Sequence, residues 1–180
     1  MTLEEMKEKI YSMIEEYSED ADELTEDEDL AAKMNSVINQ VQNELARYKK
    51  IDAYTTMEVT KDEEINITDI DPSIYQLNII KDVDADVIGG RIIFNEEGTA
   101  KIYYYKYPNQ IDKDTEDSYK FELSRDVLEI LPYGVAGDLL KSDVSSNYGQ
   151  TYSNRYKELL QSLDPRNAMS SMYFDGGVDL

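Results

Sequence analysis

Cysteine, histidine and tryptophan are all absent from the 180 residues of this chain. Without cysteine there are no disulfides, no thiolate nucleophile and no cysteine-ligated iron–sulfur cluster. Without histidine the chain lacks the usual proton carrier near neutral pH and the commonest zinc ligand. No apolar run approaches the roughly 20 residues that cross a bilayer, and the first ten residues lack the pattern of a signal peptide. We therefore expect a protein that is not an enzyme, uses no cofactor and binds no membrane.

Basic residues are scarce, and the acidic ones are concentrated at one end of the chain. The 39 Asp and Glu outnumber the 18 Lys and Arg, which gives a net charge of −21. Such a charge opposes binding to DNA phosphates or to an anionic membrane. Residues 1–30 have a net charge of −11, whereas residues 144–180 have a net charge of only −1.

The segment 15–29, called the acidic segment below, contains ten acids and no base. We interpret it either as a solvated surface or as a surface that must not adhere to DNA or to other acidic surfaces. The acidic surface candidates are Glu15, Glu16, Glu19, Asp20, Asp22, Glu23, Glu26, Asp27, Glu28 and Asp29.

Amphipathic helices are predicted at both ends of the chain. Apolar residues recur at helical spacing over residues 2–18 and from about 25 to 50, and each segment starts with a Thr-x-x-Glu capping pattern. The same period returns over residues 124–142 and 147–163. Pro132 is expected to kink the first of these later helices or to begin a second one.

Between the helices the hydrophobic period changes to that of β-strands. Gly89-Gly90 and residues 95–98 are hairpin or turn signals. Short strands at this spacing favour a small antiparallel sandwich or barrel. The predicted strands are residues 54–60, 63–68, 75–81, 84–88, 91–94 and 99–107.

The expected fold class is α+β: a helical bundle made from N- and C-terminal helical hairpins, with an inserted small antiparallel β-sandwich or barrel. Residues 1–51 and 123–165 are assigned to the helical module. Residues 52–122 are assigned to the inserted β domain, and residues 166–180 to a C-terminal tail.

Two acidic clusters contain carboxylates of the kind that bind hard cations. Asp82, Asp84 and Asp86 alternate as at the start of a calcium loop, but Val87 and Ile93 stand where that loop needs Gly and Glu. The acids in the segment 112–117 could bind a hard cation only weakly. We interpret both clusters as solvated surface, and we assign no catalytic, cofactor-binding or metal-binding residue.

Aromatic residues leave two interpretations open. The tyrosines of the strand 99–107 and of the helix 147–163 are either core residues or part of an interface, where tyrosine is enriched. The apolar residues of the tail 166–180 have no helical or strand period. They either fold back onto this chain or insert into a partner.

Residues 131–166 contain a distinctive sequence pattern. The stretch LPYGVAGDLLKSD begins at Leu131 and is followed by SNYG at 146–149, a tyrosine-rich helix and LDPR at 163–166. This pattern resembles the C-terminal part of head-to-tail connector (adaptor) proteins of tailed bacteriophages that infect Firmicutes. The helical N-terminus and the β segment are also similar to that family's layout, although the β segment is larger than in its minimal helical members. The family-like motif consists of Leu131, Pro132, Tyr133, Leu139, Leu140, Lys141, Ser142, Asp143, Tyr148, Asp164 and Pro165.

The resemblance implies a structural virion protein. Such proteins form a ring, usually of twelve copies, between the capsid portal and the tail, and they extend the DNA channel. Their C-terminal segment docks onto the portal, so the tail of this chain becomes the portal-facing candidate. The portal-binding candidates are Arg166, Met169, Met172, Tyr173, Phe174, Val178 and Leu180.

The expected partners follow from that role. They are the portal protein, further copies of this chain in the ring, and a downstream neck or tail protein. DNA is expected only as cargo that slides through an acidic channel without adhering to it. The protein is expected to be made in the host cytoplasm and to reside in the neck of the virion.

Other functions remain open at this point. Within the phage class, a neck stopper or a tail-terminator protein is the nearest alternative. An acidic DNA-mimic inhibitor of a host nuclease fits the charge. An enzyme that uses carboxylates and a divalent metal is a third possibility, although no residue pattern selects it.

Overall fold

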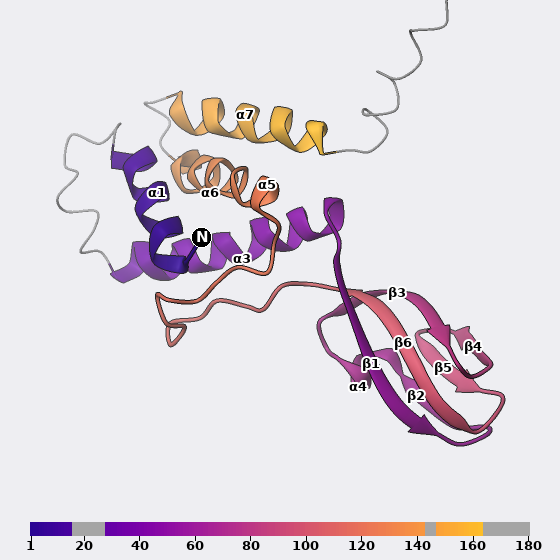
Figure 1. Ribbon diagram of the computed structural model, residues 1–180. Helices are drawn as coiled ribbons and strands as arrows, with labels where there is room; N and C mark the ends of the chain where they lie inside the picture. Colours follow the sequence, from indigo (N-terminus) through magenta and orange to yellow (C-terminus); the bar gives the residue numbers. More distant parts are fainter. Residues whose placement is uncertain (16–27, 143–146, 164–180) are drawn as a thin grey trace, which may run out of the picture. The chain divides into compact units, whose positions relative to one another are not determined.

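The chain forms two compact units, a helical unit of residues 1–49 and 110–180 and a β unit of residues 50–109 (Figure 1). Each unit is described by itself. The computed structural model describes residues 1–15, 28–142 and 147–163.

The helices lie close to where the hydrophobic period predicts them. Pro132 lies in the first turn of a second helix, which was one of the two predicted outcomes. At the N-terminus the predicted capping box is present: the Thr2 amide donates to a Glu5 carboxylate oxygen at 2.8 Å, and the Glu5 amide donates to the Thr2 hydroxyl at 3.2 Å. The helices are α1 (Leu3–Glu15), α3 (Glu28–Tyr48), α5 (Arg125–Leu128), α6 (Leu131–Leu139) and α7 (Tyr148–Ser162), with a 3₁₀ turn at Leu140–Ser142.

Helix α6 is the centre of the helical unit. It lies between α3 and α7, and α1 makes its main contacts with it as well (Figure 1). A helix that is apolar on nearly all sides must be covered on nearly all sides. The buried residues of α6 are Leu131, Pro132, Gly134, Val135, Ala136, Gly137 and Leu139.

Two glycines of α6 allow its neighbours to approach closely. A Cβ atom at Gly134 would lie 2.9 Å from both the Tyr156 ring and a Val41 methyl group. Helices α7 and α3 therefore both pack directly against this position. A Cβ atom at Gly137 would lie 2.7 Å from the Ser153 hydroxyl and 3.0 Å from the Ser153 amide nitrogen. Side chains at these positions would push the helices apart.

The β unit consists of two three-stranded antiparallel sheets, ordered β1-β6-β3 and β2-β5-β4. The two sheets contribute to one apolar core, in which Phe94, Ile92 and Ile102 are completely buried. A four-residue helix, α4 (Ile67–Ile70), follows β2. The strands are β1 (Ile51–Val59), β2 (Glu64–Asn66), β3 (Ile74–Lys81), β4 (Ala85–Ile88), β5 (Arg91–Phe94) and β6 (Gly98–Lys106).

Strand pairing within the β unit is regular where the turns predict it. Gly89 and Gly90 both have positive φ, at 60° and 83°, and join β4 to β5 as the predicted two-residue hairpin. Strand β1 pairs with β6 along its whole length, from Ile51 opposite Lys106 to Val59 opposite Gly98. The two ends of the β unit therefore meet at one end of this sheet.

The predicted bundle of two helical hairpins with an inserted sandwich or barrel is wrong. Helices α1 and α3 make their main helix contacts with the short central α6 rather than with each other, so the described residues form no N-terminal hairpin. The β unit is built from two small sheets of three strands each. The apolar stripes show that each helix has a buried side, but they do not show which helix covers it. The class α+β itself describes the structure.

The segment after β6 is attached to the helical unit by side chains of α3. Asn39 accepts a hydrogen bond from the Ile111 amide and donates one to the Ile111 carbonyl, both at 2.8 Å. Asn35 donates to the Asp112 carbonyl at 3.2 Å, and Gln110 donates to Asn43 at 3.4 Å. Residues 110–122, which the sequence groups with the strands, thus belong to the helical unit.

The close approach at Gly134 predicts the effect of adding one methyl group. Gly134→Ala should lower the free energy of unfolding of the helical unit by about 1–3 kcal/mol, because two packed side chains must move away. Chemical denaturation followed by circular dichroism measures the change. Lys157→Ala, on the exposed surface of α7, is the control and should change stability by less than about 0.5 kcal/mol. Equal stability of Gly134→Ala and the unmodified protein would contradict the packing described.

The two hydrogen bonds between the Asn39 side chain and the Ile111 backbone predict a loss of stability when Asn39 is replaced. Asn39→Ala should cost about 2 kcal/mol, because the Ile111 amide and carbonyl would lose their partner in a partly buried place. Asn35→Ala removes one longer, exposed hydrogen bond and should cost about 1 kcal/mol or less. Denaturant titrations of the two variants test this order, and the reverse order would refute it.

Candidate interaction surface

The outer face of the sheet β1-β6-β3 presents a group of tyrosines. Strand β6 alternates, so Ile102 and Tyr104 point into the core while Tyr103 and Tyr105 lie on the opposite face. Tyrosine and its aromatic relatives are enriched in protein–protein contacts. The tyrosine face, as it is called below, consists of Tyr54, Tyr75, Tyr103, Tyr105 and Tyr107, together with Ile79, Lys50 and Lys81.

Neighbouring strands align these residues in a row across the sheet. Tyr103 lies opposite Tyr54 on one side and Ile79 on the other. The rings of Tyr54 and Tyr103 have centroids 5.6 Å apart. Tyr54 is 65% exposed and Ile79 is 46% exposed, so both ends of the row remain accessible in this chain.

A second aromatic group lies beside this row. The ring of Tyr75 lies 4.7 Å from that of Tyr107 and 6.5 Å from that of Tyr105, between centroids. Two ammonium groups cover the rings: Lys50 Nζ lies 4.0 Å from the Tyr105 centroid, and Lys81 Nζ lies 5.2 Å from that of Tyr103. Contacts of this kind hold exposed rings in place and contribute about 0.5–1 kcal/mol each.

The core interpretation is confirmed for three of these tyrosines, and the interface interpretation stays a prediction for those on the outer face of the sheet. On α7, Tyr152 and Tyr156 are core residues, and their hydroxyls donate to the Met13 carbonyl at 3.1 Å and to Glu44 at 2.8 Å. Tyr104 is core on β6, and it donates to Asp71 at 3.3 Å. The residues on either side of it, Tyr103 and Tyr105, are half-buried on the opposite face of the sheet.

Most of the sequence-predicted site residues lie outside the described part of the chain. All of the portal-binding candidates, Arg166 to Leu180, fall in residues 164–180. Of the acidic candidates, only Glu15, Glu28 and Asp29 lie in described helices, at the end of α1 and the start of α3, and their side chains are not described. In the second predicted capping box, Thr25 with Glu28, Thr25 also lies outside the described residues.

The described part of the family-like motif serves the packing of the helical unit. Leu131, Pro132 and Leu139 are buried in α6. The Tyr133 ring contacts that of Tyr152, with centroids 6.2 Å apart. These residues hold helices together and form no reactive group.

The end of the motif reaches the surface. Leu140 is half-buried, Lys141 pairs with Asp138 at 2.9 Å, and Tyr148 is 40% exposed. The backbone of Ser142 ends the 3₁₀ turn. The remaining motif residues, Asp143, Asp164 and Pro165, are not among the described ones.

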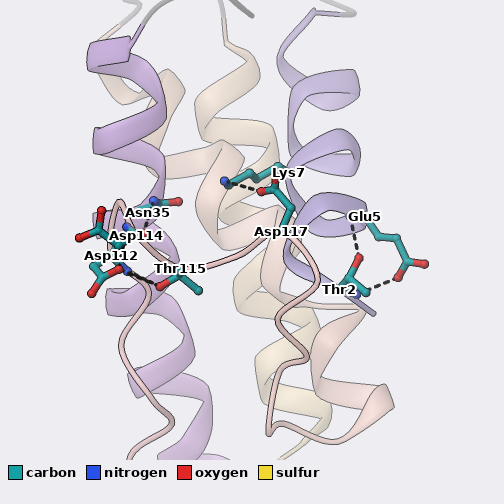
Figure 2. A network of polar contacts seen from close by, with 8 residues as sticks. All are labelled: Thr2, Glu5, Lys7, Asn35, Asp112, Asp114, Thr115 and Asp117. Atoms are coloured by element: carbon teal, nitrogen blue, oxygen red, sulfur yellow. Dashed lines mark hydrogen bonds and ion pairs between the residues drawn. The ribbon is translucent and has the colours of Figure 1, made fainter.

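The acidic loop after Ile111 directs its carboxylates toward protein donors. Asp112 accepts hydrogen bonds from the Thr115 hydroxyl at 3.0 Å and the Asp114 amide at 2.9 Å (Figure 2). Asp117 pairs with Lys7 at 3.2 Å (Figure 2). The Asp117 carbonyl accepts a hydrogen bond from the Glu4 amide. The loop therefore caps and anchors α1.

The alternating acids at the start of β4 also have hydrogen-bond or ion-pair partners within the protein. Asn95 donates to Asp84 at 3.0 Å and to Asp86 at 3.2 Å, and Lys101 pairs with Asp82 at 2.9 Å. Over the described ranges, no group of three or more acids is arranged to hold a metal ion.

An open groove of about 560 Å³ lies between α3, α6 and α7. Glu44 and Asp138 line it together with Lys141 and Lys157, so charges of both signs are present. Burial, followed by the hydrogen bond to Glu44, raises the pKa of the Tyr156 hydroxyl far above its ordinary value. A tyrosine that stays neutral in this way supports packing and does not act as an acid or base near neutral pH.

Comparison with known proteins adds no family, since no protein-family model and no curated protein matches the chain. In residues 1–15, 28–142 and 147–163, no helix combines the length and the apolar character needed to cross a membrane. The tyrosine face is therefore the candidate site that the structure itself supplies. Its signal was present in the sequence, because three consecutive tyrosines on a strand cannot all point into one core.

The hydrogen bonds of Asp112 in the acidic loop predict how stability depends on pH. The hydrogen bond from the Thr115 hydroxyl, together with that from the Asp114 amide, holds the pKa of the Asp112 carboxyl below its ordinary value near 3.9. A depressed pKa contributes stability above the unfolded-state value, and this contribution is lost as pH falls through the folded-state value. Thr115→Val should raise the pKa of Asp112, because the carboxylate loses a hydrogen bond. The free energy of unfolding that this hydrogen bond contributes should be lost at pH 6. Below the folded-state pKa of Asp112 this contribution is absent in both proteins, so the variant should lose nothing from it there.

Side-chain carboxyl NMR titration and thermal melts across this pH range measure both effects. Thr56→Val, a change of the same kind on the exposed side of β1, is the control and should leave the titration of Asp112 unchanged. An unchanged Asp112 titration in Thr115→Val would show that the hydroxyl does not stabilise the carboxylate.

Proposed function

We propose that this protein is a structural virion protein of a tailed phage, a head-to-tail connector that forms a ring between the capsid portal and the tail. The observation that carries the proposal is the exposed tyrosine face on a chain of net charge −21. Tyrosines on an exposed sheet are suited to contact another protein. The net charge opposes contact with nucleic acid.

The resemblance at residues 131–166 supports the same proposal from the sequence. The described part of the family-like motif forms the packed centre of the helical unit around α6. A motif of this kind preserves a helical scaffold. In the proposed ring the acidic segment 15–29 borders the DNA path, and residues 166–180 dock onto the portal.

The charge gives the ring a physical role. A channel lined by acids repels phosphates and offers no cationic site at which DNA would stop. The nearly neutral tail, by contrast, carries the apolar residues that a docking contact requires. The two ends of the chain thus differ in chemistry in the way that a channel wall and a docking segment differ.

Electron microscopy of this protein mixed with the portal ring of the same source tests the proposal. The full chain should add a collar of density with cyclic symmetry to the portal. Replacing Met172, Tyr173 and Phe174 with Ser should weaken portal binding more than tenfold, because each buried apolar side chain contributes about 1.5–3 kcal/mol. The matched control, Asp175→Asn with Asp179→Asn, keeps the apolar residues and should still bind.

Each other result has a defined meaning. A collar that forms with the Ser variant keeps the connector role and moves the docking site away from the tail. Absence of any collar would refute the proposal. Binding to the tail side of an already assembled neck would then favour a stopper or tail-terminator protein. Salt-sensitive binding to a basic host nuclease would favour the DNA-mimic alternative.

A further inference from the structure

Strand β1 has a long regular edge that no described strand covers. It pairs with β6 over all nine residues, and it is the outermost strand of its sheet. The opposite edge strand, β3, is irregular, with two register shifts in its pairing with β6. The edge strands of the other sheet, β2 and β4, have only three and four residues.

Short strands and bulges are common means of protecting a sheet edge from pairing with another chain. The edges formed by β2, β3 and β4 have these features, and β1 has none of them. Its sequence IDAYTTMEV contains no Pro and no Lys. Its unpaired backbone donors and acceptors thus form a template for another strand.

We propose that β1 pairs antiparallel with β1 of a second copy of this chain, with Tyr54 opposite Tyr54 of the second copy. The two β1-β6-β3 sheets would then form one continuous sheet across both copies. A two-fold contact of this kind joins a pair of copies and cannot by itself close a ring. The inference therefore concerns the free protein and does not depend on the proposed function.

Side-chain alternation limits the registers. A one-residue slip would turn core-facing side chains outward, so a two-fold pairing must be centred on a residue of β1. Centring on Thr55 places Asp52 opposite Glu58 of the second copy, twice. Like charges directly opposite one another destabilise a strand pair, so this register is disfavoured.

Centring on Tyr54 removes this repulsion. Glu58 then lies opposite Lys50 of the second copy, and Asp52 lies opposite Thr56. Within residues 50–59, among the registers centred on residues 53–56, only this one places opposite charges face to face. Lys50 is exposed and its amine rests over the Tyr105 ring, so meeting Glu58 of the second copy requires only a rotation of its side chain.

The same register continues the row of the tyrosine face. In one chain the row runs from Ile79 through Tyr103 to Tyr54, where it ends at the free edge. Pairing at Tyr54 joins this row to its counterpart in the second copy. Tyr54, which is 65% exposed in the single chain, then gains an aromatic neighbour across the two-fold axis.

A charge exchange tests both the pairing and its register. Sedimentation velocity over a concentration series should show that the full chain is a dimer. Lys50→Glu and Glu58→Lys should each weaken the dimer by about tenfold, because each replaces two attractive pairs with two repulsive ones. The double variant restores opposite charges and should dimerise within about threefold of the unmodified protein.

Lys113→Glu is the matched control, since it changes the net charge as Lys50→Glu does but lies in an exposed loop of the helical unit. It should dimerise like the unmodified protein. Circular dichroism checks that every variant is folded. Hydrogen exchange should show β1 amides that are protected in the dimer and exposed in each single variant.

The proposal is overturned if the unmodified protein remains a monomer throughout the series. It is also overturned if the single variants dimerise normally, or if the double variant is as weak as the singles. A cyclic assembly whose mass does not change in the single variants would overturn β1 pairing and leave the ring proposal standing.

Discussion

The helical unit depends on the absence of side chains at two positions of α6. Glycine costs stability inside a helix, by roughly 0.5–1 kcal/mol relative to alanine. At Gly134 and Gly137 this cost is offset because α3 and α7 can pack against the α6 backbone. The buried hydroxyls of α7 then reach their partners, Tyr156 with Glu44 and Tyr152 with the Met13 carbonyl. A single short helix thereby organises three longer ones.

The sequence predicted the elements better than it predicted their arrangement. Capping at Thr2, the new helix at Pro132 and the Gly89-Gly90 hairpin depend on local chemistry, and the structure confirms all three. The central place of α6 depends on which apolar stripes meet, and this information is not contained in the period of any one stripe. The link between Asn39 and Ile111 was missed for the same reason, because it joins residues 72 positions apart.

For the tyrosine face too, the sequence predicts which way side chains point but not which residues become neighbours. Strand alternation assigns Tyr104 to one face and Tyr103 to the other, so the sequence alone could have separated core from surface tyrosines there. It could not supply the neighbours of these rings, since Tyr54 and Ile79 join the row only through strand pairing. The acidic segment and the tail carry the strongest compositional signals, and the roles proposed for them rest on composition alone.

The pairing of Ile51 with Lys106 has a consequence for the order of folding. Helices α3 and α6 must meet although roughly eighty residues separate them along the chain. The loop-closure entropy of such a contact grows with the length of flexible chain between the two partners. Once β1 and β6 have paired, the first and last residues of the β unit are held together, and the effective loop shrinks to residues 49–50 and 107–130. If this pair forms first, the contact between α3 and α6 closes a shorter loop at a lower entropic cost, and the helical unit assembles faster.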